Sequence, residues 1–169
     1  MHNIGVYPGT FDPITMGHVD IIKRSMNFCQ ELIIAIGVNS KKNTFFSEEE
    51  RKDLILKTIT SELGSKANNI RIESFSGLLV NFAKEQKANI LIRGIRNVSD
   101  FEYEINLANI NKTLEVGIET IFLPTSPELA VVSSSMVKEI AKYGGDISRF
   151  VSKAILRSTT ECFSPSMKL

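Results

Sequence analysis

Short apolar runs alternate along this chain with longer segments whose apolar residues recur at helical spacing. The short runs have the length and composition of buried strands, and they lie at residues 4–7, 31–38, 70–74, 88–93 and 119–123. The longer segments predict helices at residues 17–28, 47–63, 77–87, 99–115 and 134–143. Because strands that alternate with helices form parallel sheets through right-handed crossovers, we expect an α/β fold, a Rossmann-like doubly wound sheet of five parallel strands with flanking helices.

Local signals mark several element boundaries. Ser47 and Glu50 form a capping box at the start of the second predicted helix. Gly144-Gly145 predicts a helix stop, and residues 146–157 predict one more helix after it. No linker or repeat divides the chain, so we expect a single domain over residues 1–160 and a tail without clear pattern over 161–169.

The composition narrows the classes of partner. The chain has 20 Lys and Arg against 19 Asp and Glu, a net charge of +1, which gives no reason to expect a nucleic-acid partner. No apolar run approaches the roughly 18 residues of a membrane span, and the N-terminus lacks the pattern of a signal peptide. Cys29 and Cys162 lie far apart and form neither a disulfide framework nor a metal-ligand pair. We therefore expect a cytoplasmic protein with no membrane or nucleic-acid partner.

The segment P-G-T-F-D-P-I-T-M-G-H, at residues 8–18, separates the first strand from the first helix. Gly9 allows close approach of the backbone to a ligand, and the helix start near Gly17 offers unpaired N–H groups that favour an anion. Neither the P-loop pattern nor the Rossmann glycine pattern is present. His18 is placed to donate to a phosphate oxygen, but a histidine at a helix start is also common as a surface or capping residue. The residues alone therefore leave a simple turn and a phosphate site as alternatives.

Basic residues follow two other strands. L-I-R-G-I-R places Arg93 and Arg96 at the carboxyl edge of the fourth strand, where a planar guanidinium matches phosphate oxygens. The alternative is that both arginines pair with nearby acids, namely Asp100, Glu102 or Glu104. Lys41 and Lys42 follow the second strand at the same edge. Because the carboxyl ends of parallel strands lie together, these groups are expected to converge on one crevice.

The segment after the fifth strand contains Ser133 to Ser135, followed by Lys138 one turn later. One serine can cap the helix, and a run of hydroxyls and free N–H groups at a helix start also suits a polyphosphate. The two interpretations are compatible. Among the apolar residues near the end of the third strand, Leu78, Leu79 and Phe82 are interpreted as core, although Leu79 can also line a pocket for an apolar part of a substrate.

Taken together, these segments resemble a known family. Residues 15–18, T-M-G-H, resemble the [HT]-x-G-H signature of nucleotidyltransferases, and S-S-S-M-V-K-E at 133–139 resembles the second signature of that superfamily. With Y-P-G-T-F-D-P-I-T, L-I-R-G-I-R and D-F-E-Y-E at their spacings, the chain is similar to the bacterial phosphopantetheine adenylyltransferases over about residues 4–150. The resemblance implies a fold of the nucleotidyltransferase type.

The resemblance also implies an activity, which is transfer of AMP from ATP to 4'-phosphopantetheine, giving dephospho-coenzyme A and pyrophosphate in coenzyme A biosynthesis. The phosphate of the acceptor attacks the α-phosphorus of ATP, so no protein nucleophile is expected and catalysis comes from positioning and charge stabilisation. Members of the family are homohexamers. Mg²⁺ is expected to be held by the phosphates, because no carboxylate cage is visible in the sequence.

Residue roles follow from the same resemblance. Thr10 and His18 would contact the reacting phosphates, with His18 stabilising the transition state, and Lys42 rather than Lys41 falls on the substrate-binding lysine. The residues implied for phosphopantetheine are Thr10, Lys42, Leu79 and Arg93, of which Leu79 would touch the pantetheine arm and Arg93 the phosphate. Those implied for ATP are Thr10, Phe11, His18, Gly94, Ile95, Arg96, Glu104, Leu129, Ala130, Val131, Val132, Ser133, Ser134 and Ser135. The chain has E-L-A-V-V where many family members carry an aromatic residue, which removes an adenine-stacking group from this edge.

Other functions share parts of this pattern. A sibling transferase acting on nicotinate mononucleotide or glycerol 3-phosphate would have the same turn and histidine, and the spacing of L-I-R-G-I-R and D-F-E-Y-E favours phosphopantetheine over those acceptors. A class I aminoacyl-tRNA synthetase would need tRNA-binding domains, for which 169 residues leave no room. A non-catalytic ATP-binding module would need a phosphate cradle but no clamp for the acceptor phosphate, which Lys42 and Arg93 would provide.

Overall fold

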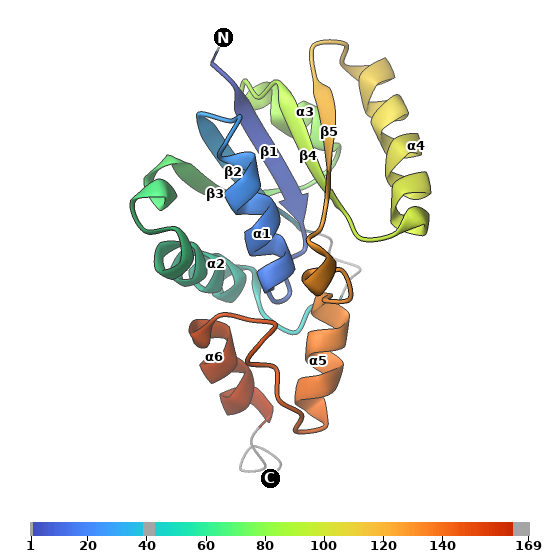
Figure 1. Ribbon diagram of the computed structural model, residues 1–169. Coiled ribbons are helices and arrows are strands. Elements are labelled where there is room, and N and C mark those ends of the chain that lie inside the picture. Colours follow the sequence, from blue (N-terminus) through green and yellow to red (C-terminus); the bar gives the residue numbers. More distant parts are fainter. Residues whose placement is uncertain (1, 39–42, 164–169) are drawn as a thin grey trace.

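A computed structural model describes residues 2–38 and 43–163 (Figure 1). All five expected strands are present in one parallel sheet: β1 Ile4–Gly9, β2 Glu31–Gly37, β3 Ile70–Phe75, β4 Ile90–Ile95 and β5 Glu119–Pro124. Their order across the sheet is β3-β2-β1-β4-β5. Since the chain moves outward from β1 in one direction and then returns to β4 on its other side, the order reverses between β1 and β4. The predicted doubly wound α/β fold is confirmed.

The α-helices are α1 Met16–Ser25, α2 Glu48–Leu63, α3 Leu79–Glu85, α4 Val98–Leu114, α5 Ser134–Lys142 and α6 Lys153–Phe163, and short 3-10 helices lie at Gly64–Asn69 and Pro127–Leu129. The capping box of α2 is present, because the Glu50 N–H donates to Ser47 Oγ and the Ser47 N–H donates to the Glu50 carboxylate. After α5, Gly144 adopts a left-handed φ of 74° and the Gly145 N–H donates to the Ile140 carbonyl, so the predicted stop is also confirmed.

The helix expected over 146–157 begins seven residues later than predicted, at Lys153. Asp146 accepts hydrogen bonds from both the N–H and the hydroxyl of Ser148, which favours a turn over a helix at this point. The Phe150 carbonyl accepts from the Met16 N–H at the start of α1. The segment before Lys153 therefore bonds to the first turn of α1 and does not continue as part of α6. At its other end, α6 extends to Phe163 and includes the first residues of the expected tail, and residues 164–169 lie outside the described part.

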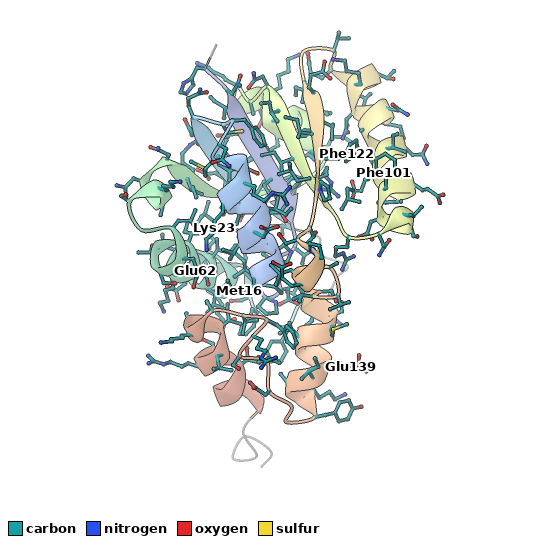
Figure 2. All side chains as sticks on the ribbon, in the orientation of Figure 1. Met16, Lys23, Glu62, Phe101, Phe122 and Glu139 are labelled. Atoms are coloured by element: carbon teal, nitrogen blue, oxygen red, sulfur yellow. The ribbon has the colours of Figure 1, made fainter. Side chains whose placement is uncertain are left out.

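Two apolar cores lie on opposite faces of the sheet. Successive strand residues point to opposite faces, so Ile34 and Ile92 join a core with α1 and α2, while Ile33 and Leu91 join a second core with α3. The first core also includes residues of α5 and α6, which lie beyond the carboxyl end of β1 (Figure 1). On the surface, α1 and α2 are joined by an ion pair between Lys23 and Glu62 (3.3 Å; Figure 2).

Helix α4 differs from the others, because none of its 17 residues is buried. It lies along the β5 edge of the sheet (Figure 1), where the rings of Phe101 and Phe122 meet edge to face with centroids 5.5 Å apart (Figure 2). Its exposed apolar residues include Tyr103, Ile110 and Leu114, each more than half exposed. Such a helix leaves an apolar surface uncovered in the single chain.

Among the described residues, no helix combines the length and the apolar character that crossing a membrane requires.

Candidate active site

A cavity of about 550 Å³ lies at the carboxyl end of the sheet, where the strand order reverses between β1 and β4. Ligands of doubly wound sheets bind at this switch point, and the volume suits a nucleotide-sized molecule. The cavity is lined from the ends of β1, β4 and β5, from the first turns of α1 and α5, from α4 and from the segment before α2. Sequence-predicted residues in its lining are Thr10, Phe11, His18, Arg93, Gly94, Arg96, Glu104, Val132, Ser133, Ser134 and Ser135.

The turn after β1 is shaped by the ring of Phe11. This side chain is buried, and a Cβ added at Gly9 would lie 2.8 Å from the ring, so glycine is required at that position. The same ring meets the imidazole of His18 edge to face, with centroids 5.1 Å apart, and the ring of Tyr7 at 5.5 Å. Aromatic packing thus fixes the plane of the His18 ring within the cavity wall.

Asp12 ties this turn to two other elements. Its side chain is 4% exposed, and its oxygens accept from the backbone N–H groups of Phe45 and Phe46 (both 2.9 Å) and from Lys138 Nζ (2.7 Å). Burial alone would favour the protonated acid, but the Lys138 bond and the two N–H groups outweigh it and lower the pKa of Asp12 below its usual value. The carboxylate therefore holds together the β1 turn, the segment before α2 and helix α5.

His18 is held in one orientation by the start of its own helix. The Thr15 N–H donates to His18 Nδ1 at 3.0 Å, and the Thr15 hydroxyl lies 2.9 Å from the same nitrogen. Burial, together with the positive charge of Arg96, lowers the pKa of His18 to about 4. Since Nδ1 accepts a hydrogen bond in the neutral ring, the proton resides on Nε2. His18 is therefore a neutral donor at neutral pH.

At the end of β4, Arg93 and Arg96 both pair with acids of α4, which is the alternative that the sequence left open. Arg93 donates from Nε and Nη2 to the two oxygens of Glu104, with the Nε bond at 2.6 Å. Arg96 donates to Asp100, with its Nε at 2.8 Å. Both arginines nevertheless line the cavity, and the Glu104 pair leaves Nη1 of Arg93 free of that carboxylate. The ion-pair and ligand-binding interpretations are thus compatible.

The three serines at the start of α5 have different partners. Ser133 is the N-cap and accepts from the Met136 N–H (3.1 Å), whereas the Ser134 hydroxyl donates to the Pro13 carbonyl (2.8 Å). Ser135 is exposed and lines the cavity. One serine thus caps the helix, as predicted, while the second attaches α5 to the β1 turn.

Several predicted residues lie outside the cavity lining. Leu79 begins α3 and packs against the second core, and Leu129 packs against the first. Ile95, Ala130 and Val131 also fall outside the lining, and Val131 is 66% exposed. Lys41 and Lys42 lie outside the described residues. For these positions, a role in ligand binding stays a prediction.

Some residues that build the cavity carry no recognisable signal in the sequence. Asp12 lies within a turn segment, and its partners lie 33, 34 and 126 positions along the chain. Tyr7 looked like an ordinary strand residue, yet it lines the cavity, and burial raises the pKa of its hydroxyl so that it stays protonated. Lys138 was noted beside the serines without a partner. Nothing in the local sequence identifies such long-range pairs.

Acidic groups in the cavity are already paired with cations. Asp12 is bonded to Lys138, Asp100 to Arg96 and Glu104 to Arg93. Within residues 2–38 and 43–159, no cluster of three His, Cys, Asp or Glu side chains is arranged to hold a metal ion. The carboxylates of the cavity lining are thus each engaged by a cation, and binding of Mg²⁺ through the phosphates of a nucleotide stays a prediction.

Several solved structures share this fold. A Vibrio parahaemolyticus protein assigned as a nicotinate-nucleotide adenylyltransferase superimposes with a TM-score of 0.71 at 14% identity, covering 97% of this chain and 98% of that one. The nicotinic acid mononucleotide adenylyltransferase of Plasmodium falciparum, complexed with NaAD, gives 0.67 at 18% identity over 97% and 99% of the two chains. A bifunctional NMN adenylyltransferase/ADP ribose pyrophosphatase of Francisella tularensis, complexed with AMP and a Mn ion, gives 0.71 at 17% identity, covering 95% of this chain and 49% of its own.

The sequence itself matches a family model. The match to the model described as cytidylyltransferase-like runs over residues 6–140, from within β1 into α5, and so includes every residue that lines the cavity. That family consists of nucleotidyltransferases, and the site described above has the donors such a reaction needs. The chain belongs to the cytidylyltransferase-like family.

Proposed function

We propose that this chain transfers the AMP group of ATP to 4'-phosphopantetheine, giving dephospho-coenzyme A and pyrophosphate. One observation supports the assignment of Arg93 and Arg96 to an anion site. The segments L-I-R-G-I-R and D-F-E-Y-E, on which the family resemblance rests, form one unit at the cavity, because Arg93 pairs with Glu104 and Arg96 with Asp100. An arginine held by a carboxylate on one edge offers its remaining N–H groups to an anion in a fixed direction.

In this proposal the chain supplies binding and charge stabilisation. An oxygen of the acceptor phosphate attacks the α-phosphorus of ATP, a new P–O bond forms, and the bond to the oxygen that bridges to the β-phosphate breaks to release pyrophosphate. His18 Nε2–H donates to a phosphate oxygen whose negative charge grows in the transition state. Arg93 and Lys42 hold the acceptor phosphate, and the first turns of α1 and α5 receive the nucleotide phosphates with Mg²⁺ bound to them.

The remaining assignments belong to the same proposal. Leu79 contacts the pantetheine arm, and Gly94, Ile95 and residues 129–135 contact ATP. Glu104 is assigned to the ATP site together with Arg93, because both of its carboxylate oxygens accept hydrogen bonds from that arginine.

A direct assay of acceptors tests the proposal. ATP and Mg²⁺ are incubated with 4'-phosphopantetheine, nicotinate mononucleotide or nicotinamide mononucleotide, and pyrophosphate and the adenylylated product are measured. Of the three acceptors, we expect that 4'-phosphopantetheine gives rapid pyrophosphate release and that the two mononucleotides do not. Turnover of either mononucleotide instead would assign the chain to NAD synthesis, and binding of ATP without turnover of any acceptor would make it a non-catalytic ATP-binding module.

We further propose that the chain assembles as a homohexamer. What supports assembly is helix α4, whose exposed apolar side chains include Tyr103, Ile110 and Leu114 and which buries none of its residues in the single chain. Contact with another subunit would remove this surface from water. Sedimentation velocity is expected to give a hexamer, and Ile110→Glu is expected to shift it to smaller species. A monomeric wild-type protein would refute this assignment.

A further inference from the structure

Arg51 of α2 is a buried charge whose hydrogen-bond partners are carbonyl oxygens. It is 4% exposed, and it donates from Nη1 to the Thr10 carbonyl (2.8 Å) and from Nε to the Ser47 carbonyl (3.4 Å). In the part of the chain that the structure describes, no ion pair includes it; the charge of Glu48 acts on it from beyond salt-bridge distance, and Glu48 itself pairs with Lys52. Because the opposite charge of Glu48 is shared with Lys52 and makes no direct bond to Arg51, the buried guanidinium favours a further anion close by.

The bond from Arg51 fixes the direction of the peptide between Thr10 and Phe11. The cis bond among the described residues is Asp12-Pro13, so this peptide is trans, and its C=O and N–H point to opposite sides. Since the Thr10 carbonyl points toward α2, the Phe11 N–H points away from α2. Thr10 and Phe11 line the cavity, whereas the described lining does not contain Arg51. The N–H therefore lies on the cavity side of the turn.

The Phe11 backbone is held in a conformation that is unfavourable for a large side chain. Its φ is 49°, in the left-handed region, and its ring is buried. Within the described residues, the Phe11 N–H has no hydrogen-bond partner. Such a conformation persists when its surroundings enforce it, and residues of this kind cluster at ligand sites. The turn thus presents a fixed, unsatisfied donor to the cavity.

We propose that Arg51 is a positioning residue, which acts through the Thr10 carbonyl to aim and polarise the Phe11 N–H toward a phosphate of the nucleotide. A hydrogen bond to the carbonyl draws electron density from the peptide and strengthens its N–H as a donor. The buried positive charge behind the turn also favours the negative charge that develops in front of it. Arg51 thereby serves the adenylyl transfer proposed above, on which its assignment rests.

Isotope labelling isolates this peptide. The sequence contains two Thr-Phe pairs, Thr10-Phe11 and Thr44-Phe45, so protein labelled with carbonyl-¹³C threonine and ¹⁵N phenylalanine gives two correlated amide signals. Thr44→Ser removes the labelled threonine before Phe45 and with it the correlated Phe45 signal, so the signal that remains belongs to Phe11. The Phe45 N–H already donates to Asp12 and serves as the internal reference. On addition of Mg²⁺ and α,β-methylene-ATP, the Phe11 signal is expected to move downfield, and in Arg51→Lys and Arg51→Met it is expected to move less.

Kinetics separate positioning from simple stabilisation of α2. We expect kcat to fall about 10- to 100-fold in Arg51→Met, and less in Arg51→Lys, with a smaller change in the KM for ATP. Leu54→Ala, which removes another buried side chain of the same helix, is the control. It is expected to lower the melting temperature while keeping kcat. Should Arg51→Met fail to fold, Arg51→Lys, which retains the charge but loses the planar fork, decides by the same two measurements.

The possible results are distinct. A Phe11 signal that stays in place while calorimetry shows the nucleotide analogue bound would overturn the proposal, as would Arg51 variants that match Leu54→Ala in kcat. A normal Phe11 response without turnover of 4'-phosphopantetheine would remove that acceptor and leave the role of Arg51 intact. If the nucleotide analogue does not bind wild-type protein, both the adenylyl transfer and this role fall together.

Discussion

The two walls of the cavity are built differently. The wall formed by the β1 turn, α1 and α5 is tied through buried groups, among them the Asp12 carboxylate at 4% exposure and the Thr15 N–H bond to His18. The facing wall, formed by β4 and α4, is held by two ion pairs on a helix that buries no residue. The Arg93–Glu104 pair is partly buried, whereas the Arg96 side chain of the second pair is 39% exposed. Buried bonds keep one geometry, whereas exposed pairs are weak and exchange partners easily. We infer that the first wall fixes the reacting phosphates and the second adjusts to the acceptor.

The largest effect on activity is expected from His18, which lies in the wall formed by the β1 turn, α1 and α5, the fixed wall. His18→Ala removes a donor that strengthens in the transition state, so kcat should fall about 10²- to 10³-fold while the Kd for ATP changes little. Initial rates of pyrophosphate release and calorimetric titration with ATP measure the two quantities. His2→Ala, which changes the other histidine of the chain, is the control and should behave as wild type. Equal losses of ATP affinity and of kcat would make His18 a ground-state ligand.

A comparison of two carboxylates tests the difference in rigidity directly. Asp12→Asn removes the charge of a buried carboxylate that accepts from Lys138 and from two backbone N–H groups, and it should lower the free energy of unfolding by about 3 kcal/mol. Asp100→Asn removes an ion pair whose arginine is 39% exposed and should cost less than about 1 kcal/mol. Urea unfolding at one subunit concentration gives both values. Similar losses in the two variants would show that the walls do not differ.

Substitutions in the wall formed by β4 and α4 should change substrate affinity. Arg93→Ala is expected to weaken binding of 4'-phosphopantetheine about 10- to 100-fold, since one or two charge-assisted hydrogen bonds are lost, and to change ATP affinity far less. Arg96→Ala is the matched variant on the same strand end, and it should weaken ATP more than the acceptor. Titration with each substrate separately measures both. The opposite preference would exchange the roles of the two arginines.

The sequence predicted the strands and most helices because each depends on local periodicity, and the α2 capping box and the Gly144 stop are local as well. It also placed Thr10, His18, Arg93 and the serines at the cavity, since parallel strands end at one edge of the sheet.

What the sequence left undetected depends on pairs that folding brings together. Arg51 has the appearance of an ordinary helix cation, and its contact with the Thr10 carbonyl spans 41 positions. The late start of α6 has the same origin, because the Phe150 carbonyl bonds to Met16 across the fold. Local rules do not reach contacts of this separation.

The last prediction concerns the pH dependence of stability. His18 has a pKa of about 4 in the folded protein and about 6.5 when unfolded, so between these values the unfolded chain binds the extra proton and acidification destabilises the fold. Above about pH 6.5 this contribution is constant. The lowered pKa of Asp12 acts at more acidic pH, where its stabilisation is lost as the carboxylate protonates. Urea unfolding of wild type and His18→Gln from pH 7.5 to 4.5 separates the two, because the variant should lose less stability over this range. Parallel pH profiles would mean that His18 titrates normally in the folded protein and that the fixed wall does not hold it neutral.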